Sequence, residues 1–275
     1  MNKVNEREFP TVEELSRGFS EFKLVQAKEL IGKKVVLNYE EGYKMIYEFL
    51  DHEAIKIIYV NNAIEERVSS IYTAVSPREN IYMIDFVWSF GDTKSITTVI
   101  DFTKNIATTL KSMLPNKEEV AISQFERGDK GLPLTSVKAE FEHAAVDTDF
   151  TETTLKHEVT NDLIGERILF KYSSRDIYEH IYLNENYYTW HCISGIEKGL
   201  CDTDKCFYWK IDENLYWFTW LEKVVPTVGT VVEDLDQDKM RSYGKIFGYE
   251  SYEMGKVTNF AVGSYATMIN NVECK

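Results

Sequence analysis

The sequence has no long apolar run, few cysteines and a deficit of basic residues, and each shortage excludes a class of protein. No stretch of about 18 apolar residues occurs, which argues against a transmembrane helix. The segment Met1–Glu8 has no apolar core, so we expect no secretory signal, a cytoplasmic location and no membrane partner. The four cysteines, expected to be reduced thiols, all lie in the second half of the chain: Cys192, Cys201, Cys206 and Cys274.

Charge and missing motifs narrow the ligand classes further. The formal net charge is −14, so a polyanion such as nucleic acid would be repelled. The chain lacks the glycine-rich motifs that cradle phosphate groups. It also lacks the paired Cys and His spacing of a zinc site, and we therefore expect no metal and no cofactor.

An internal repeat organises the chain. The segment Leu30–Tyr39 reappears as Leu163–Tyr172, shifted by 133 residues, and Glu79–Tyr82 reappears as Glu213–Tyr216, shifted by 134. Asp101 and Asp234 are also 133 residues apart. A period this long predicts two copies of a whole domain rather than a solenoid. We place the domains at residues 1–150 and 151–275.

Both copies consist mainly of β-branched and aromatic runs broken by turn signals. A capping box of Thr11 and Glu14 predicts one short helix over residues 11–22. Six or more short strands per copy, with hairpin-length links, predict an all-β protein of two tandem antiparallel barrels, each able to enclose one small ligand. The expected strands are 34–38, 44–50, 55–60, 68–75, 81–89, 95–102, 167–172, 178–183, 187–193, 206–211, 215–225, 230–235 and about 257–262.

The copies differ in the polarity of their predicted inner faces. Side chains alternate along a strand, so every second residue shares a face. The first copy places Tyr47 and Trp88 where the second places His180 and Glu222. A carboxyl buried among aromatic rings has a raised pKa, and a nearby His would titrate near neutrality. The second copy is therefore the expected site, unless Glu222 points outward and pairs with a lysine.

Further residues of the second copy complete the candidate site. We expect a catalytic set of His180, Glu222 and Tyr178. Trp190 and His191 alternate, so only one of them can point inward. The expected ligand-binding residues are Trp190, His191, Tyr182, Tyr208, Trp220 and Lys210.

Six segments of the second copy form a recognisable set: His157–Gly165, Tyr178–Asn184, Tyr188–Cys192, Glu197–Asp204, Trp220–Pro226 and Gly244–Gly248. Together they resemble the MoaF family, which is named for an association with molybdenum cofactor biosynthesis. The similarity is dense over 157–248 and looser over 10–150. The resemblance implies calycin-type (lipocalin-like) barrels.

Three functions stay open at this point. The first is binding of a small aromatic or heterocyclic ligand in the second barrel, associated with molybdenum cofactor metabolism. The second is a cofactor-free enzyme that acts on a small aromatic or unsaturated acid, either a decarboxylase-like lyase or an isomerase. Only fold analogy supports this second function. The third is an assembly protein. A homo-oligomer fits any of them.

Overall fold

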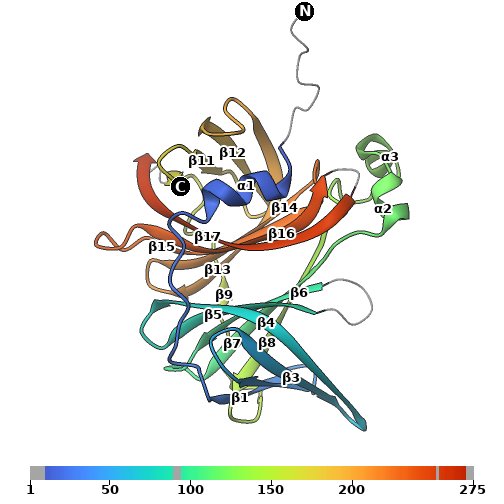
Figure 1. Ribbon diagram of the computed structural model, residues 1–275, viewed down its shortest axis with the longest axis vertical. Coiled ribbons are helices and arrows are strands. Elements are labelled where there is room, and N and C mark those ends of the chain that lie inside the picture. The colour runs from blue at the N-terminus through green and yellow to red at the C-terminus, as the bar shows by residue number, and fades with distance from the viewer. Residues whose placement is uncertain (1–9, 89–93, 252–253, 271–275) are drawn as a thin grey trace, which may run out of the picture.

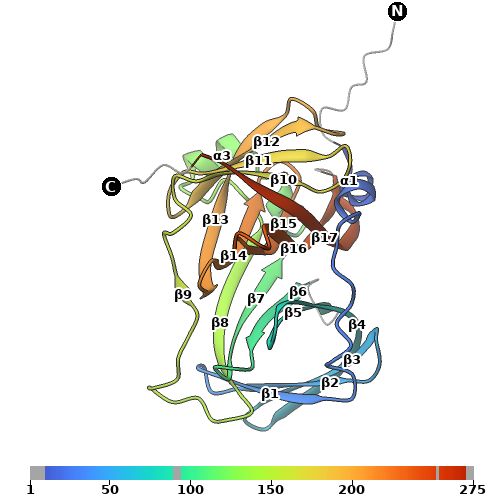
Figure 2. The ribbon, with the colours of Figure 1, turned by 90° about the vertical axis from the view of Figure 1, so that its left-hand side faces the viewer.

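The computed structural model describes residues 10–88, 94–251 and 254–270. It consists of two closed antiparallel barrels of eight strands each, packed one against the other (Figures 1 and 2), which confirms the predicted fold class. In each barrel every strand pairs with the next along the chain, and the last strand pairs with the first. Closure pairs the first and last strands of each barrel, so the aromatic strands do not present the edges that favour aggregation.

The first barrel is formed by β1 (Lys34–Tyr39), β2 (Lys44–Phe49), β3 (Ala54–Asn61), β4 (Ile64–Arg78), β5 (Ile81–Trp88), β6 (Lys94–Asp101), β7 (Ile106–Met113) and β8 (Lys138–Val146). The second barrel is formed by β10 (Arg167–Lys171), β11 (Ile177–Tyr182), β12 (Tyr187–Ser194), β13 (Cys201–Asp212), β14 (Leu215–Glu222), β15 (Thr227–Asp234), β16 (Arg241–Ser251) and β17 (Met254–Asn270). The short β9 (Glu158–Val159) pairs with β13. Two short helices, α2 (Lys117–Ala121) and α3 (Gln124–Asp129), lie in the link between β7 and β8.

The repeat extends to strand register. Val35 pairs with Tyr47 in the first barrel, and Ile168 pairs with His180 in the second, both shifted by 133 residues. The first barrel ends at Val146 and the second begins at Arg167. The division at residue 150 itself stays a prediction.

Strands β7 and β8 carry little of the apolar pattern that indicated the others. In β7, Thr108, Thr109 and Ser112 are buried. In β8, Phe141 reaches across to the second barrel, where its ring lies 5.2 Å from that of Trp209 and 5.5 Å from that of Trp217. These strands are held by closure of the barrel and by contacts with the other domain, which a local pattern does not encode.

The two barrels share an apolar interface. Ile81, Met83 and Val99 of the first barrel pack with Trp217 and Leu221 of the second in one buried cluster. Because side chains alternate, β14 turns Trp217 and Leu221 toward the first barrel and Phe218 and Trp220 into its own barrel. Both faces of β14 are therefore buried, which explains its continuous aromatic run.

A buried ion pair lies within this interface. Asp85 on β5 is 4% exposed and Lys245 on β16 is 2% exposed, and the two are in direct contact. Ser95 and Thr97 donate hydrogen bonds to Asp85 at 2.9 and 3.0 Å, and Asn259 of the second barrel donates one at 2.7 Å. The carboxylate is thus fully partnered, as a buried charge must be.

The helix α1 (Val12–Phe19) precedes the first barrel in the chain but packs on the second (Figure 1). Thr11 and Glu14 form the predicted capping box. Phe19 stacks on Tyr172 with ring centroids 4.3 Å apart. The chain then crosses β17 at Gly263, where a Cβ atom would lie 2.3 Å from the carbonyl oxygen of Phe22. Glycine at this position lets the N-terminal segment lie against the barrel.

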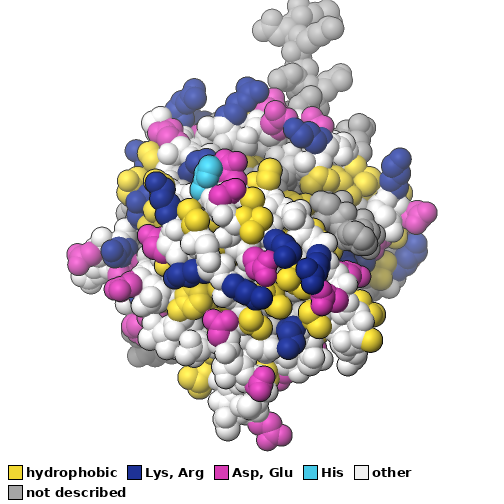
Figure 3. All heavy atoms as spheres, turned by 60° about the horizontal axis from the view of Figure 1, so that its bottom comes forward, with side chains coloured by type: hydrophobic (Ala, Val, Ile, Leu, Met, Phe, Trp, Pro, Cys, Tyr) yellow, Lys and Arg dark blue, Asp and Glu magenta, His cyan; other side chains and the backbone are white. Residues whose placement is uncertain are grey.

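No helix among residues 10–88, 94–251 and 254–270 is long and apolar enough to cross a membrane. The face of the first barrel in Figure 3 carries basic and acidic side chains interspersed. Cys192, Cys201 and Cys206 are free, and Cys274 lies outside the described residues.

We predict that breaking the Asp85–Lys245 pair on one side destabilises the protein more than removing it entirely. Asp85→Leu leaves a buried ammonium without its counter-charge and should lower the free energy of unfolding by about 3–5 kcal/mol. The double variant Asp85→Leu/Lys245→Met should recover most of that loss. Urea unfolding measures both, with Glu65→Ala at an exposed position as the control. A loss below about 1 kcal/mol for Asp85→Leu, the range of surface pairs, would contradict the assignment.

Candidate functional site

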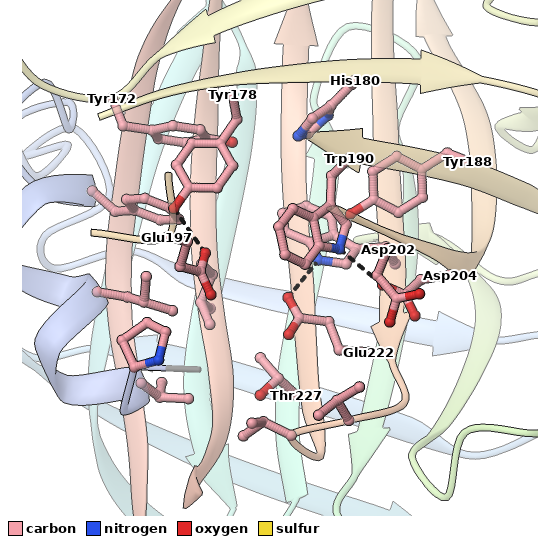
Figure 4. A pocket seen from close by; sticks show the side chains of 18 residues that line it. Tyr172, Tyr178, His180, Tyr188, Trp190, Glu197, Asp202, Asp204, Glu222 and Thr227 are labelled. Atoms are coloured by element: carbon pink, nitrogen blue, oxygen red, sulfur yellow. Dashed lines mark hydrogen bonds between the residues drawn. The ribbon is translucent and has the colours of Figure 1, made fainter. Parts of the chain in front are cut away.

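A cavity of about 40 Å³ lies in the second barrel beneath α1. Its walls are mainly aromatic, and its polar groups are mainly carboxyls (Figure 4). The residues that line it are Pro10, Val12, Leu15, Phe19, Tyr172, Tyr178, His180, Tyr188, Trp190, Glu197, Asp202, Asp204, Trp220, Glu222, Val224, Val225, Thr227 and Ile246.

His180 projects from β11 into this aromatic surrounding. It is 3% exposed, and its Nδ1 atom has no hydrogen-bond partner within the described residues. Its ring lies 4.6 Å from that of Phe170 and 5.2 Å from that of Tyr188. Burial lowers the pKa of His180 to about 3, so the imidazole is neutral.

The first barrel shows why His180 has no partner. There Tyr47, the register equivalent of His180, bonds to Thr98 at 3.0 Å, and Thr98 bonds to Thr109 at 3.0 Å. In the second barrel the positions of Thr98 and Thr109 are taken by Val231 and Gly244. The polar network that fills the first barrel is therefore absent from the second. The interior of the first barrel thus contains a satisfied network of hydroxyl groups among its apolar side chains.

Two indole rings hold two of the carboxyls. Trp220 Nε1 donates to Glu222 Oε1 at 3.0 Å, and Trp190 Nε1 donates to Asp204 Oδ2 at 3.1 Å. The Trp220 ring lies across Gly229, its partner on β15, where a Cβ atom would come within 1.9 Å of the indole. Glycine is required there because any side chain would displace the ring.

The carboxyls crowd one another. Burial, the largest effect, and then the charges of Asp204 and Glu197 raise the pKa of Glu222 well above its usual range. Burial raises the pKa of Glu197 to about 7 and that of Asp204 to about 6. Tyr178 donates to Glu197 at 2.7 Å. Lys223, which lies next to Glu222 in the sequence, is already paired with Asp202 and Asp204.

Five of the nine residues expected from the sequence line the cavity: His180, Glu222, Tyr178, Trp190 and Trp220. His180 and Glu222 face the same cavity, but no hydrogen bond or ion pair joins them in the described chain. The structure brings them together as lining groups and not as a bonded pair.

The other four expected residues lie elsewhere. Tyr182 and Tyr208 are buried in the barrel core beyond the cavity, and Tyr182 donates to Glu233 at 2.7 Å. His191 lies on the outer face because it alternates with Trp190, and its Nδ1 is 3.7 Å from Glu179. Lys210 lies at the far end of β13, paired with Asp162 at 2.8 Å and with Glu213 at 3.2 Å. Lys210 therefore does not line this cavity.

Sequence reasoning missed several lining groups. Glu197, Asp202 and Asp204 lie in a segment that resembles the MoaF family but are not among the expected site residues. The alternation of β13 could have placed Asp202 and Asp204 on the face of Tyr208. No local pattern could have brought Val12 and Phe19 of α1 to this barrel. The described residues contain no group of three or more His, Cys, Asp or Glu side chains arranged to hold a metal ion.

We predict that the cavity carboxyls destabilise the ligand-free protein as pH rises. A carboxyl with a raised folded-state pKa holds its proton while the unfolded chain has lost its own, so the free energy of unfolding falls with pH between the two values. For Glu197 that window runs from 4.5 to about 7. Glu197→Gln should therefore gain stability relative to the unmodified protein across this window, by at most about 3 kcal/mol. Urea unfolding at several pH values measures the difference, and the exposed Glu185→Gln should show none. A gain that is equal at the two ends of the window would contradict the prediction.

Comparison with known proteins agrees with the resemblance in the sequence. The MoaF C-terminal domain matches residues 157–272, and the MoaF N-terminal domain matches residues 7–116. Protein MoaF of Klebsiella aerogenes is 39% identical over 199 residues, which cover 72% of this chain and 74% of that protein. A crystal structure of a candidate β-lactamase from Burkholderia vietnamiensis covers 41% of this chain and 99% of its own at 10% identity, with a TM-score of 0.33, too low to carry an argument. The two domain matches and the Klebsiella relative show that this chain belongs to the MoaF family.

Proposed function

We propose that the second barrel binds a small aromatic or heterocyclic molecule in the cavity beneath α1. The observation that carries the proposal is the unpartnered Nδ1 of His180, buried in a cavity whose equivalent in the first barrel is filled by bonded hydroxyls. Buried polar groups without partners are rare in folded proteins and need an explanation, such as a missing ligand. A ligand that bonds to His180 supplies one.

The walls favour a flat ligand. Tyr178, Tyr188, Trp190 and Trp220 present ring surfaces to the cavity (Figure 4). Aromatic rings attract one another in stacked or edge-to-face arrangements beyond the effect of area alone. A planar ring held between such walls, with a few polar groups to orient it, is the usual composition of a small-molecule site.

The cavity is too small for such a ligand while α1 is in place. A volume of about 40 Å³ holds only about three water molecules. Val12, Leu15 and Phe19 of α1 close one side of it. The helix has only eight residues, and isolated helices of this length are marginal in water. We therefore infer that α1 moves aside when the ligand enters.

The family context bears on the purpose of binding. The MoaF family is named for an association with molybdenum cofactor biosynthesis, and this chain belongs to that family. We propose that the ligand is a compound of molybdenum cofactor metabolism. This step rests on the family and not on the geometry of the cavity.

Ligand binding should be visible in tryptophan fluorescence. Titration with pterin and with phenol should quench the emission, because Trp190 and Trp220 line the cavity. Trp190→Phe and Trp220→Phe should each reduce the quenching. Trp209→Phe is the matched control, since Trp209 packs against Phe141 outside the second barrel. No quenching by either compound, or quenching lost equally in Trp209→Phe, would contradict the proposed site.

Locking α1 should slow binding. A Cβ atom on Gly18 would lie 2.8 Å from Cγ of Asp176, so Cys residues at both positions are close enough for a disulfide. In a Cys201→Ser background, Gly18→Cys/Asp176→Cys should bind the probe more slowly when oxidised and recover on reduction. Stopped-flow fluorescence measures the rates, with Cys201→Ser alone as the control. Equal rates in the oxidised and reduced protein would show that α1 does not gate the cavity.

A further inference from the structure

Building on the proposed function, we infer that the cavity recognises a planar nitrogen base through a cationic N–H edge, as in an amidinium or a protonated amino-heterocycle. Free hydrogen-bond acceptors, unpaired carboxyls and the unpartnered imidazole of His180 support this class of ligand.

The polar atoms left free in the cavity are mainly acceptors. Glu197 accepts one hydrogen bond from Tyr178, and Glu222 accepts one from Trp220, which leaves one carboxyl oxygen of each without a partner in the described chain. The two indole N–H groups and Lys223 are already occupied as donors. The hydroxyls of Tyr172, Tyr188 and Thr227 can donate or accept, and Oγ1 of Thr227 is buried without a partner in the described chain. A carboxyl whose raised pKa keeps its proton also has an O–H donor, which it loses when it ionises beside a bound cation. A ligand that complements these groups must bring donors.

The charges point to the same ligand. Four carboxyls face a single lysine, and that lysine pairs with only two of them. A cation placed beside Glu222 would offset the charges of Asp204 and Glu197, which after burial raise the pKa of Glu222. Tyrosine and tryptophan faces also attract cations through their ring quadrupoles. An anion in this cavity would meet unpaired carboxyls and no free cation of the described residues.

His180 supplies the independent evidence. Its Nδ1 is buried and unpartnered, and the imidazole is neutral, so one ring nitrogen can accept a hydrogen bond. Figure 4 shows the ring on the opposite side of the cavity from Glu222. Acceptors on two sides suit a flat base with N–H groups along its edge. A quaternary ammonium ion fits the aromatic walls equally well but has no N–H to offer His180, Glu197 or Glu222.

Four probes of similar size separate these possibilities. Benzamidine is a planar N–H cation, benzyltrimethylammonium is a cation without N–H groups, benzamide is neutral and benzoate is an anion. Tryptophan quenching and calorimetry with the full chain should rank benzamidine as the tightest binder at neutral pH, with benzoate undetectable.

Each outcome has a distinct meaning. Binding of none of the four would overturn the proposed function together with this inference. Benzamide or benzoate binding as tightly as benzamidine would leave the proposed function standing and overturn the inference. Benzyltrimethylammonium binding as tightly as benzamidine would show that the cavity binds cations through its aromatic rings alone. It would overturn the inference that N–H groups are recognised.

Variants test the named carboxyls. Glu222→Gln and Glu197→Gln should each weaken benzamidine roughly 10- to 100-fold, the range for a hydrogen bond to a charged group, and should leave benzamide unchanged. Glu233→Gln is the matched control, because Glu233 is buried in the same barrel and bonds to Tyr182 away from the cavity. Retained benzamide binding shows that a variant is folded. Equal losses for both probes would overturn the inference.

Benzamidine should also bind more tightly as pH rises. The carboxyls of Asp204 and Glu197, whose pKa values are about 6 and about 7, become charged in this range while the amidinium keeps its proton. An affinity that is flat or falls between about pH 5 and pH 8 would count against the inference. The titratable groups of the described residues around Glu222 are His180, Tyr172, Tyr178, Tyr188, Glu197, Asp202, Asp204 and Lys223, while the residues of α1 that line the cavity are uncharged.

Discussion

Burial of both faces of β14 is the constraint on which the rest of this structure depends. Trp217 and Leu221 pack against the first barrel, so the opposite face must present Phe218 and Trp220 to the interior of the second. A one-residue slip would exchange the two sets and bury Glu222 in the interface. The contact between the barrels therefore sets the register of the cavity wall. The Asp85–Lys245 ion pair acts in the same interface, because only one alignment of the barrels partners both charges.

The two barrels share one strand register but differ in the polar groups of their interiors. The first fills its interior with Tyr39, Tyr47, Thr98 and Thr109, whose hydroxyls satisfy one another. The second replaces the two threonines by Val231 and Gly244 and leaves His180 unpartnered, with several carboxyls close by. Unpaired buried polar groups reduce stability, and proteins retain such groups mainly where they serve a function. The second barrel therefore carries a locally unfavourable set of buried polar groups, which the first barrel lacks and which α1 covers.

The sequence predicted much of the fold and part of the candidate site. The repeat predicted two domains of one fold, and alternation placed His180, Tyr178 and Glu222 on inward faces. Alternation did not say how far along a barrel a residue lies, so Tyr182, Tyr208 and Lys210 share inward positions but do not reach the cavity. It also could not choose between Trp190 and His191, because either face of β12 was chemically acceptable. The bend and closure of the barrel decided both questions.

The sequence by itself determined the strands, the duplication and the polar substitutions, because these follow from local alternation and from the comparison of two copies. Only the tertiary structure decided which carboxyls meet, since Glu197, Asp204 and Glu222 come from a loop and two strands that barrel closure brings together. It also decided that α1 covers the second barrel, although the helix precedes the first in the chain. Such contacts depend on long-range packing of apolar surfaces, which carries no periodic signature within either partner segment.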